Sequence, residues 1–202
     1  MADNRPSQPG NTTFDGGLVP PKGPFTTMQR MSGTTVLAYG GAAPQVDESV
    51  LLASGARLIG NVRVAADASI WFNAVLRADE HSISIGAATN VQDNCSIHVT
   101  APDHPAVIGS RVTIGHSAVL HGCTVADHCL IGMGAILLDG CAVEEHTIVA
   151  AGALLPSGKR YPAGSLLMGA PARVVRPLAD SEIQSIGDAA EHYIEMARSY
   201  LR

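Results

Sequence analysis

Residues 108–137, IGSRVTIGHSAVLHGCTVADHCLIGMGAIL, place an aliphatic side chain at almost every sixth position. A repeat of fixed period predicts a solenoid, in which each short unit buries its apolar face only against its neighbours. The same step covers most of the chain, in four runs separated by irregular steps. The positions are Val46, Leu52, Leu58, Val64, Ile70, Leu76, Ile85, Val91, Ile97, Ile108, Ile114, Leu120, Val125, Ile131, Leu137, Val143, Val149 and Leu155.

Each unit of six is interpreted as a short strand that ends in a tight corner, which glycine fits. Three units would close one triangular coil, and successive coils would stack as parallel strands ~4.8 Å apart. The aliphatic residue and a small residue four positions later would point into the prism. Cys95, Cys129 and Cys141 hold that small inward position, so we expect reduced packing residues rather than metal ligands or disulfides.

Two irregular steps predict loops, at residues 77–84 with three extra residues and at residues 98–107 with five. The count of six is lost after Leu155, which predicts a different structure for the C-terminal segment. There, Ser181 with Gln184 could form the capping box of a helix. The expected divisions are a flexible N-terminal extension at 1–31, an all-β solenoid at 32–177, and a helix packed on the solenoid at 178–202.

Charge and composition argue against several kinds of partner. The 202 residues carry a net charge of −5 with no basic cluster, which disfavours nucleic acid. No apolar run approaches the ~20 residues needed to cross a membrane, and the N-terminus lacks the pattern of a secretory signal. We therefore expect a cytoplasmic protein without a membrane or nucleic-acid partner.

Two histidines are expected to stack on one edge of the prism. Arg77, His98 and His121 each follow an aliphatic residue of one column, whose members lie three units apart. The backbones of His98 and His121 should therefore be ~4.8 Å apart. Two nitrogens bound to one tetrahedral zinc ion, each ~2.0–2.1 Å from the metal, are roughly 3.3 Å apart. The register thus predicts that both histidines can bind one metal ion.

His116 belongs to the neighbouring side of the prism, where Asp93 holds the equivalent position one coil earlier. It cannot easily join His98 and His121 within one chain. In a threefold assembly, however, one side of each prism would meet the next side of its neighbour, and His116 of a second chain could complete the set. Three histidines with an open fourth position are typical of catalytic zinc. A histidine on a solenoid edge is also commonly a plain polar surface residue, and the other histidines show no such register.

Three segments together resemble the γ-class carbonic anhydrases and their close bacterial homologues, over roughly residues 34–201. The segments are SIWFNAVLRADEHSISIGAATNVQDNCSIH (69–98), VTIGHSAVLHGC (112–123) and LIGMGAILLDGC (130–141). The resemblance implies a left-handed parallel β-helix, an exception to the usual right-handed crossover. It also implies a homotrimer with zinc at the subunit interfaces, bound by His98 and His121 of one chain and His116 of the next.

The resemblance assigns further roles in the site. Gln92 would position the attacking hydroxide, and the pair of Arg77 and Asp79 would help tie the subunits together. The other matched positions are Asn90, Asp93 and, on the C-terminal helix, Tyr193.

The chain departs from the family pattern in two places. Ala78 replaces the usual glycine between the paired arginine and aspartate, and residues 115–123 contain no acidic side chain that could carry a proton away. Glu80 and His104 are the remaining nearby candidates for that task.

The function implied is the reversible hydration of CO2 to bicarbonate, with Zn2+ as the metal and Fe2+ or Co2+ as alternatives. Two other functions stay open. One is an acyl- or CoA-dependent transferase or thioesterase on the same fold, which would use a histidine base without a metal. The other is a protein without catalytic activity that binds a metal ion or a metal chelate such as a siderophore.

Overall fold

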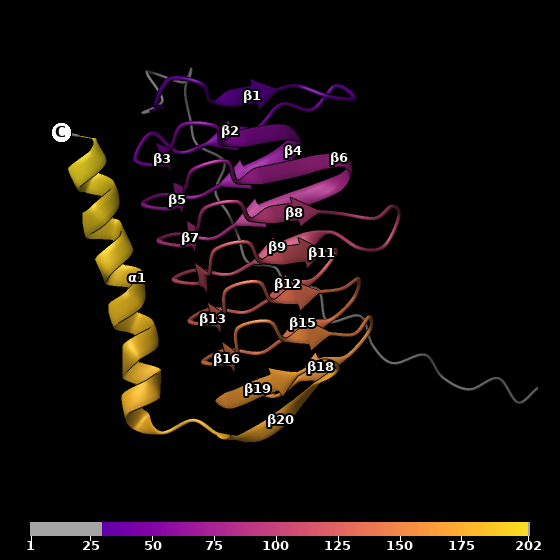
Figure 1. Ribbon diagram of the computed structural model, residues 1–202. Helices are drawn as coiled ribbons and strands as arrows, with labels where there is room; N and C mark the ends of the chain where they lie inside the picture. The colour runs from indigo at the N-terminus through magenta and orange to yellow at the C-terminus, as the bar shows by residue number, and fades with distance from the viewer. Residues whose placement is uncertain (1–29, 202) are drawn as a thin grey trace, which may run out of the picture.

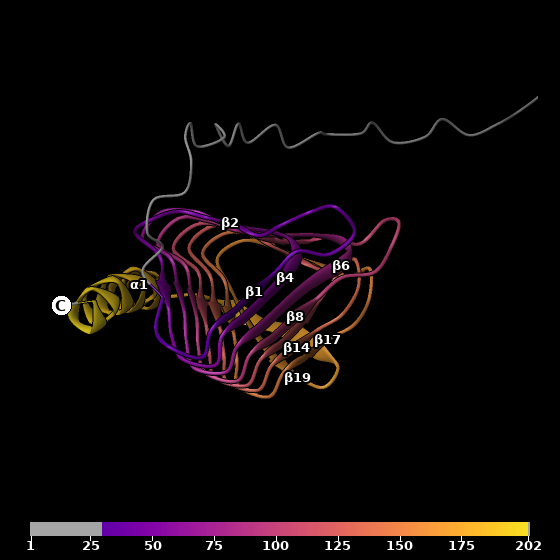
Figure 2. The same cartoon turned by 90° about the horizontal axis from the view of Figure 1, so that it is seen from above.

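The computed structural model describes residues 30–201, which form a parallel β-solenoid with one helix along its side (Figure 1). Viewed along its axis, the solenoid is triangular, and the helix lies against one of its sides (Figure 2). The fold is the predicted left-handed parallel β-helix of hexapeptide repeats with a C-terminal helix. The predicted N-terminal extension lies, except for its last two residues, outside the described part of the chain.

Three walls of stacked strands enclose the core. The first wall consists of β3 (Leu51–Leu52), β5 (Ser69–Ile70), β7 (Asn90–Val91), β10 (Thr113–Ile114), β13 (Leu130–Ile131), β16 (Ile148–Val149) and β19 (Ser165–Gly169), with β20 (Ala172–Pro177) antiparallel at its end. The second wall contains β1 (Thr35–Leu37), β8 (Ser96–His98), β11 (Val119–His121), β14 (Ile136–Leu137) and β17 (Leu154–Leu155). The third wall contains β2 (Gln45–Val46), β9 (Ala106–Ile108), β12 (Thr124–Val125), β15 (Ala142–Val143) and β18 (Arg160–Tyr161). Two longer strands, β4 (Arg57–Val64) and β6 (Val75–Ile85), turn the corner between the second and third walls and join them into one sheet.

The repeated aliphatic positions form the core, as predicted, because every one of them is buried. The prediction that the count of six ends at Leu155 is wrong. Tyr161 and Leu167 continue the inward columns, 3% and 0% exposed, and pair with Val143 and Val149 of the preceding coil. The repeat was not recognised at position 161 because an aromatic residue takes the place of the aliphatic one. The hydroxyl of Tyr161 donates to the carbonyl of Ala172 at 3.3 Å, near the end of the solenoid.

One of the two predicted loops is a strand. Residues 77–84 lie within β6, and the three extra residues form an outward bulge between Ala78 and Ile83, where the register against β4 shifts. Residues 98–107 do contain a loop, between β8 and β9, and the backbones of Thr100 and His104 exchange two hydrogen bonds across it, of 3.1 and 3.0 Å.

The glycines of the repeat serve two purposes. Gly115 and Gly132 have ordinary φ angles and allow close approach between coils, because a Cβ at Gly132 would lie 2.4 Å from the backbone nitrogen of Ala151 in the next coil. Other glycines, such as Gly134 with φ of 66°, take the left-handed conformation of a corner, which Asn94 and Ser117 also adopt, with φ of 61° in both. The repeat therefore tolerates non-glycine residues at a corner more readily than between two coils.

The single described helix, α1 (Asp180–Tyr200), lies within the segment 178–202 for which a helix was predicted. The predicted capping box of Ser181 and Gln184 is wrong, because Ala179 is the N-cap and the Glu182 carboxylate accepts its N–H at 2.9 Å. The buried face that contacts β3, β5, β7 and β10 contains Ile186, Ala190, Ile194 and Ala197.

All four cysteines are buried and free, in line with the predicted packing role. Among residues 30–201, no helix combines the length and the apolar character needed to cross a bilayer.

Candidate metal centre

His98 and His121 meet at the end of the second wall. They pair in register between β8 and β11, as the repeat count predicts. Nδ1 of His98 lies 3.0 Å from Nε2 of His121. Parallel pairing fixes the backbones, so the two rings reach this distance from neighbouring coils without a long loop.

A carboxylate holds the outer nitrogen of each ring. Nε2 of His98 lies 3.0 Å from Oδ1 of Asp79, and Nδ1 of His121 lies 2.7 Å from Oδ1 of Asp139. Arg77 donates to the other oxygen of Asp79. We call Arg77, Asp79, His98, His121 and Asp139 the first half-site.

The protonation of these aspartates decides what the rings present to each other. Burial raises the pKa of Asp79, but hydrogen bonds from Arg77 and His98 outweigh it and hold that pKa below its usual value. Burial likewise raises the pKa of Asp139, and hydrogen bonds from His121 and Thr100 outweigh it. Both carboxylates are therefore ionised near neutral pH and can only accept hydrogen bonds. The outer ring nitrogens must then carry the protons.

This arrangement fits a metal ion. With protons on the outer nitrogens, the two inner nitrogens of His98 and His121 present lone pairs to each other across 3.0 Å. Such a contact is repulsive unless a metal ion or a proton is shared between the rings. The distance is close to the roughly 3.3 Å expected for two ligands of tetrahedral zinc, and a carboxylate on the outer nitrogen is the usual support of a metal-binding histidine.

His116 lies in a second group, at the corner between β10 and β11. Its Nδ1 is 3.1 Å from Oδ2 of Asp93, whose Oδ1 accepts the N–H of Phe72 at 3.1 Å. This ring too has one nitrogen on a carboxylate, which leaves Nε2 for another partner. We call Asn90, Gln92, Asp93 and His116 the second half-site.

Gln92 and Asn90 brace that corner from inside. The side-chain oxygen of Gln92 accepts the N–H of His116 at 3.2 Å, and its Nε2 donates to Asn90 at 3.1 Å. Asn90 donates in turn to the hydroxyl of Thr113 at 2.9 Å. Gln92 and Asn90 are only 5% and 1% exposed, so this network fixes the backbone from which His116 projects.

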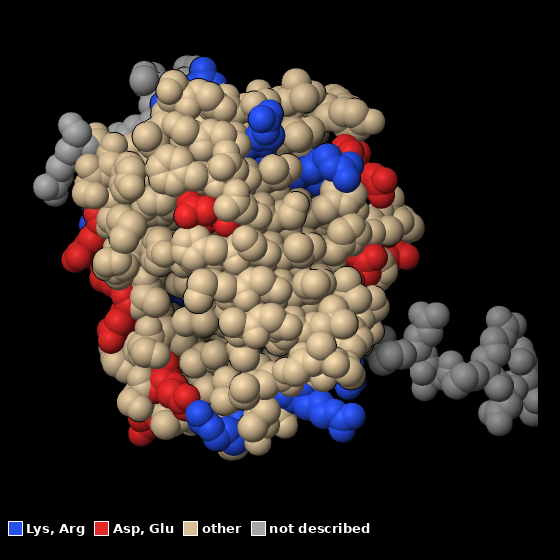
Figure 3. All heavy atoms as spheres, in the orientation of Figure 1, with Lys and Arg blue, Asp and Glu red and all other residues tan. Residues whose placement is uncertain are grey.

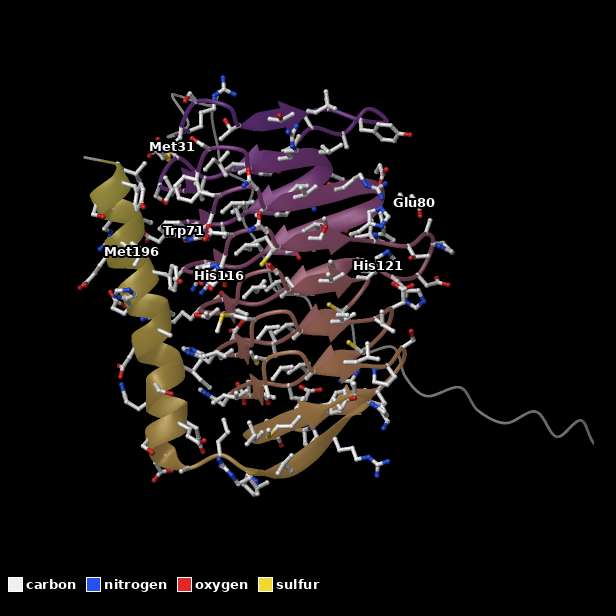
Figure 4. The ribbon with its side chains drawn as sticks, in the orientation of Figure 1. Met31, Trp71, Glu80, His116, His121 and Met196 are labelled. Carbon is white, nitrogen blue, oxygen red and sulfur yellow. The ribbon has the colours of Figure 1, made fainter. Side chains whose placement is uncertain are left out.

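The two half-sites lie at opposite ends of the second wall. Five residues of chain, which would span at most about 16 Å if fully extended, separate His116 from His121. Figure 4 shows His116 near Trp71 and α1, with His121 on the other side of the solenoid near Glu80. Within residues 30–201, no three histidine, cysteine or acidic side chains are grouped as a ligand set. The structure thus separates His116 from the other two histidines, as the register predicts.

Known proteins resemble this chain over most of its length. It is 48% identical over 163 residues to "Gamma carbonic anhydrase 1, mitochondrial" of Arabidopsis thaliana, a match that covers 78% of this chain and 59% of that longer relative. It is 46% identical over 154 residues to "Probable carbonic anhydrase" of Methanocaldococcus jannaschii, covering 76% of this chain and 96% of the archaeal protein.

The chain belongs to the γ-class carbonic anhydrase family. No protein-family profile matches it. Among solved structures, a hexapeptide transferase family protein from Anaplasma phagocytophilum superposes with a TM-score of 0.79 and 41% identity, over 82% of this chain and 98% of the other.

Two remaining candidate residues, Tyr193 from the family match and Glu80 as a possible proton carrier, divide between the half-sites. Tyr193 of α1 packs edge-on against Trp71, with ring centroids 5.5 Å apart, and burial together with the charge of Asp93 raises its pKa. It therefore accompanies the second half-site. Glu80 is exposed beside the first half-site, in an open depression of about 360 Å³ that Asp79 also lines.

Asp139 is the one member of the first half-site that we did not predict. A signal was present, because Asp139 lies two residues after Leu137, which continues the column of Leu120 by one coil. A carboxylate at that corner needs to reach back only ~4.8 Å to meet the ring of His121.

Proposed function

We propose that the protein catalyses the reversible hydration of CO2 to bicarbonate as a homotrimer. Zn2+ would be bound at each subunit interface by His98 and His121 of one chain and His116 of the next, with Fe2+ or Co2+ as alternative metals. The observation that carries the proposal is the pair of ring nitrogens 3.0 Å apart whose outer nitrogens are both held by aspartates. The names of the curated relatives as carbonic anhydrases support it.

The surface between the half-sites is suited to contact with a second copy. Figure 3 shows a broad area with few charged side chains, in the region of β8, β11 and β14. Val119 and Ile136, adjacent in register on β11 and β14, are 36% and 37% exposed there. A threefold arrangement would bring the first half-site of one chain to the second half-site of its neighbour.

The reaction proposed is CO2 + H2O ⇌ HCO3⁻ + H⁺. Zinc held by the three histidines would lower the pKa of water far below its value in bulk solution, to about 7, and would so supply hydroxide near neutral pH. Asp79 and Asp139 keep the lone pairs of their histidines directed inward, and Gln92 fixes the corner of His116. Glu80 or His104 would take the released proton to solvent.

Three measurements on the purified protein test this proposal together. Metal analysis should find one zinc per chain, light scattering should give the mass of a trimer, and stopped-flow measurement should show CO2 hydration that a chelator abolishes. A monomer that still binds one metal per chain would contradict the shared site. A metal-loaded trimer that does not accelerate CO2 hydration would show that the protein binds metal but does not catalyse this reaction.

A transferase is the second candidate, because the Anaplasma structure is named for a hexapeptide transferase family. Acyl transfer from acetyl-CoA by metal-free protein would favour it. The paired aspartates argue for the metal instead, since they fix two histidines where a transferase base needs one. A cytoplasmic location remains a prediction, which cell fractionation would test.

A further inference from the structure

Asp139 lies at the corner that follows β14, one coil beyond His121, and both of its oxygens are engaged. Oδ1 is 2.7 Å from Nδ1 of His121, and Oδ2 accepts the hydroxyl of Thr100 at 3.1 Å. The carboxylate therefore bridges a histidine of the second wall to the loop between β8 and β9. Its side chain is 30% exposed, which leaves it partly shielded from water.

The loop is shaped to reach this carboxylate. Its two backbone hydrogen bonds between Thr100 and His104 close it into a compact turn. His104 then lies against the corners of Gly122 and Gly140, where an added Cβ would meet its Cβ at 2.7 Å and its Cε1 at 3.3 Å. An added Cβ at Gly122 would also meet Oδ1 of Asp139 at 2.3 Å, so glycine at this corner allows the loop and the carboxylate to lie together. The five extra residues thus serve a structural purpose at the metal centre.

The contact determines which nitrogen of His121 is free. An ionised carboxylate accepts a hydrogen bond from Nδ1–H, so the proton stays on Nδ1 and the lone pair on Nε2. Nε2 is the atom that faces His98. Without Asp139, the neutral ring could place its proton on either nitrogen or rotate away.

We propose that Asp139, supported by Thr100 of the β8–β9 loop, is a positioning residue that fixes the tautomer and ring orientation of His121 for metal binding. The inference rests on the proposed function only in taking His121 as a metal ligand. Asp139 would then support one ring nitrogen of His121, as Asp79 lies beside a ring nitrogen of His98 and Asp93 beside one of His116.

The test compares Asp139→Ala, Asp139→Asn and Thr100→Val with wild type in the full chain. The dissociation constant of Zn2+ is measured by chelator competition, and the visible spectrum of the Co2+-loaded protein reports the ligand geometry. Asp139→Ala should weaken Zn2+ binding about 10–100-fold and alter the Co2+ spectrum. Asp139→Asn should restore part of the affinity, because its amide oxygen still accepts from Nδ1–H. Thr100→Val should weaken binding about two- to tenfold, the effect of one hydrogen bond.

Glu144→Ala is the matched control, because it also removes one carboxylate, from the exposed pair with Arg160, and should leave the affinity unchanged. Wild-type binding by Asp139→Ala, with the same Co2+ spectrum, would overturn the inference while leaving the proposed function intact. A lower melting temperature of the metal-free variant with unchanged affinity would show a merely structural role and overturn it as well. If Asp139→Ala does not fold, unchanged affinity in Thr100→Val would overturn the inference in its place. A wild-type protein that binds no Zn2+ would refute the proposed function itself.

Discussion

Two inactive variants should complement each other, because each would retain one intact half-site. His116→Ala removes the ligand of the second half-site and leaves His98 and His121 in place. His121→Ala breaks the first half-site, whose two rings are 3.0 Å apart, and leaves His116 with its aspartate. Since three ligands are needed for strong zinc binding, each variant alone should form a trimer with empty sites.

The number of complete interfaces sets the size of the recovery. His116 and His121 lie on different sides of the solenoid in one chain, so they can serve a single metal only across an interface. A closed ring of three subunits has three such interfaces. In any mixed trimer, one interface alone joins an intact first half-site to an intact second half-site. Random mixing makes about three quarters of the trimers mixed, so the zinc content should recover to roughly one quarter of the wild-type value.

The assay is co-refolding of equal amounts of the two variants, each with a different tag, followed by tandem purification and metal analysis. The purified mixed trimers should hold one zinc each. His128→Ala serves as a control, because His128 stacks on His146 in a pair outside both half-sites and its loss should leave the zinc content unchanged. Mixed trimers of confirmed composition that remain empty would show that both histidines serve a site within one chain, and the threefold reasoning would be refuted.

Three further predictions concern the scaffold. Gly132→Ala should destabilise the protein by about 1–3 kcal/mol in urea unfolding, because the added Cβ would meet the backbone of the next coil at 2.4 Å. Gly187→Ala in α1, where the added Cβ meets open space, should instead stabilise the protein by about 0.5–1 kcal/mol. Burial raises the pKa of the Cys129 thiol to about 12, so a thiol reagent at pH 8 should label it only after unfolding, and rapid labelling of the native protein would contradict the burial. Hydrogen bonds from Arg176 and from the Ala179 N–H hold the pKa of Glu182 at about 2, below the ordinary 4.5. The ionised Glu182 therefore stabilises the fold above pH ~4.5, and this stabilisation is lost as the pH falls towards 2. The difference in melting temperature between wild type and Glu182→Gln should shrink over that range, and a constant difference would argue against the ion pair.

The sequence predicted the scaffold well because a solenoid has only local rules. Each unit must fill the same place in the coil, so a step of six identifies both the inward residues and the register between coils. That register alone places His98 beside His121. The count failed at Tyr161, where an aromatic side chain fills an inward position near the end of the stack. It also failed over residues 77–84, since a bulge can absorb extra residues without interrupting β6.

The site was predicted less completely, because register gives positions along a wall and not the direction of side chains. Asp79 was found through resemblance to a family and Asp93 also through its register with His116, and the contact of each with a histidine ring became clear only from the structure. Asp139 was missed because it contacts His121 from the following coil, in a stretch that has the pattern of an ordinary repeat. The helix cap was assigned wrongly for a similar reason: a Glu182 side chain caps the backbone of Ala179, a residue with no side-chain acceptor of its own.

A core of this kind also explains why the candidate metal ligands lie at the edges of the solenoid. The prism interior is filled by one aliphatic and one small side chain per unit, so it leaves no room for a metal or a substrate. Polar ligands must therefore project from corners. Neighbouring coils bring His98 and His121 together at one corner, whereas His116 lies at another corner of the prism. In the proposed site, the third histidine therefore has to come from a second copy. Metal binding and assembly should thus be linked, and each bound metal should stabilise the trimer by mass action.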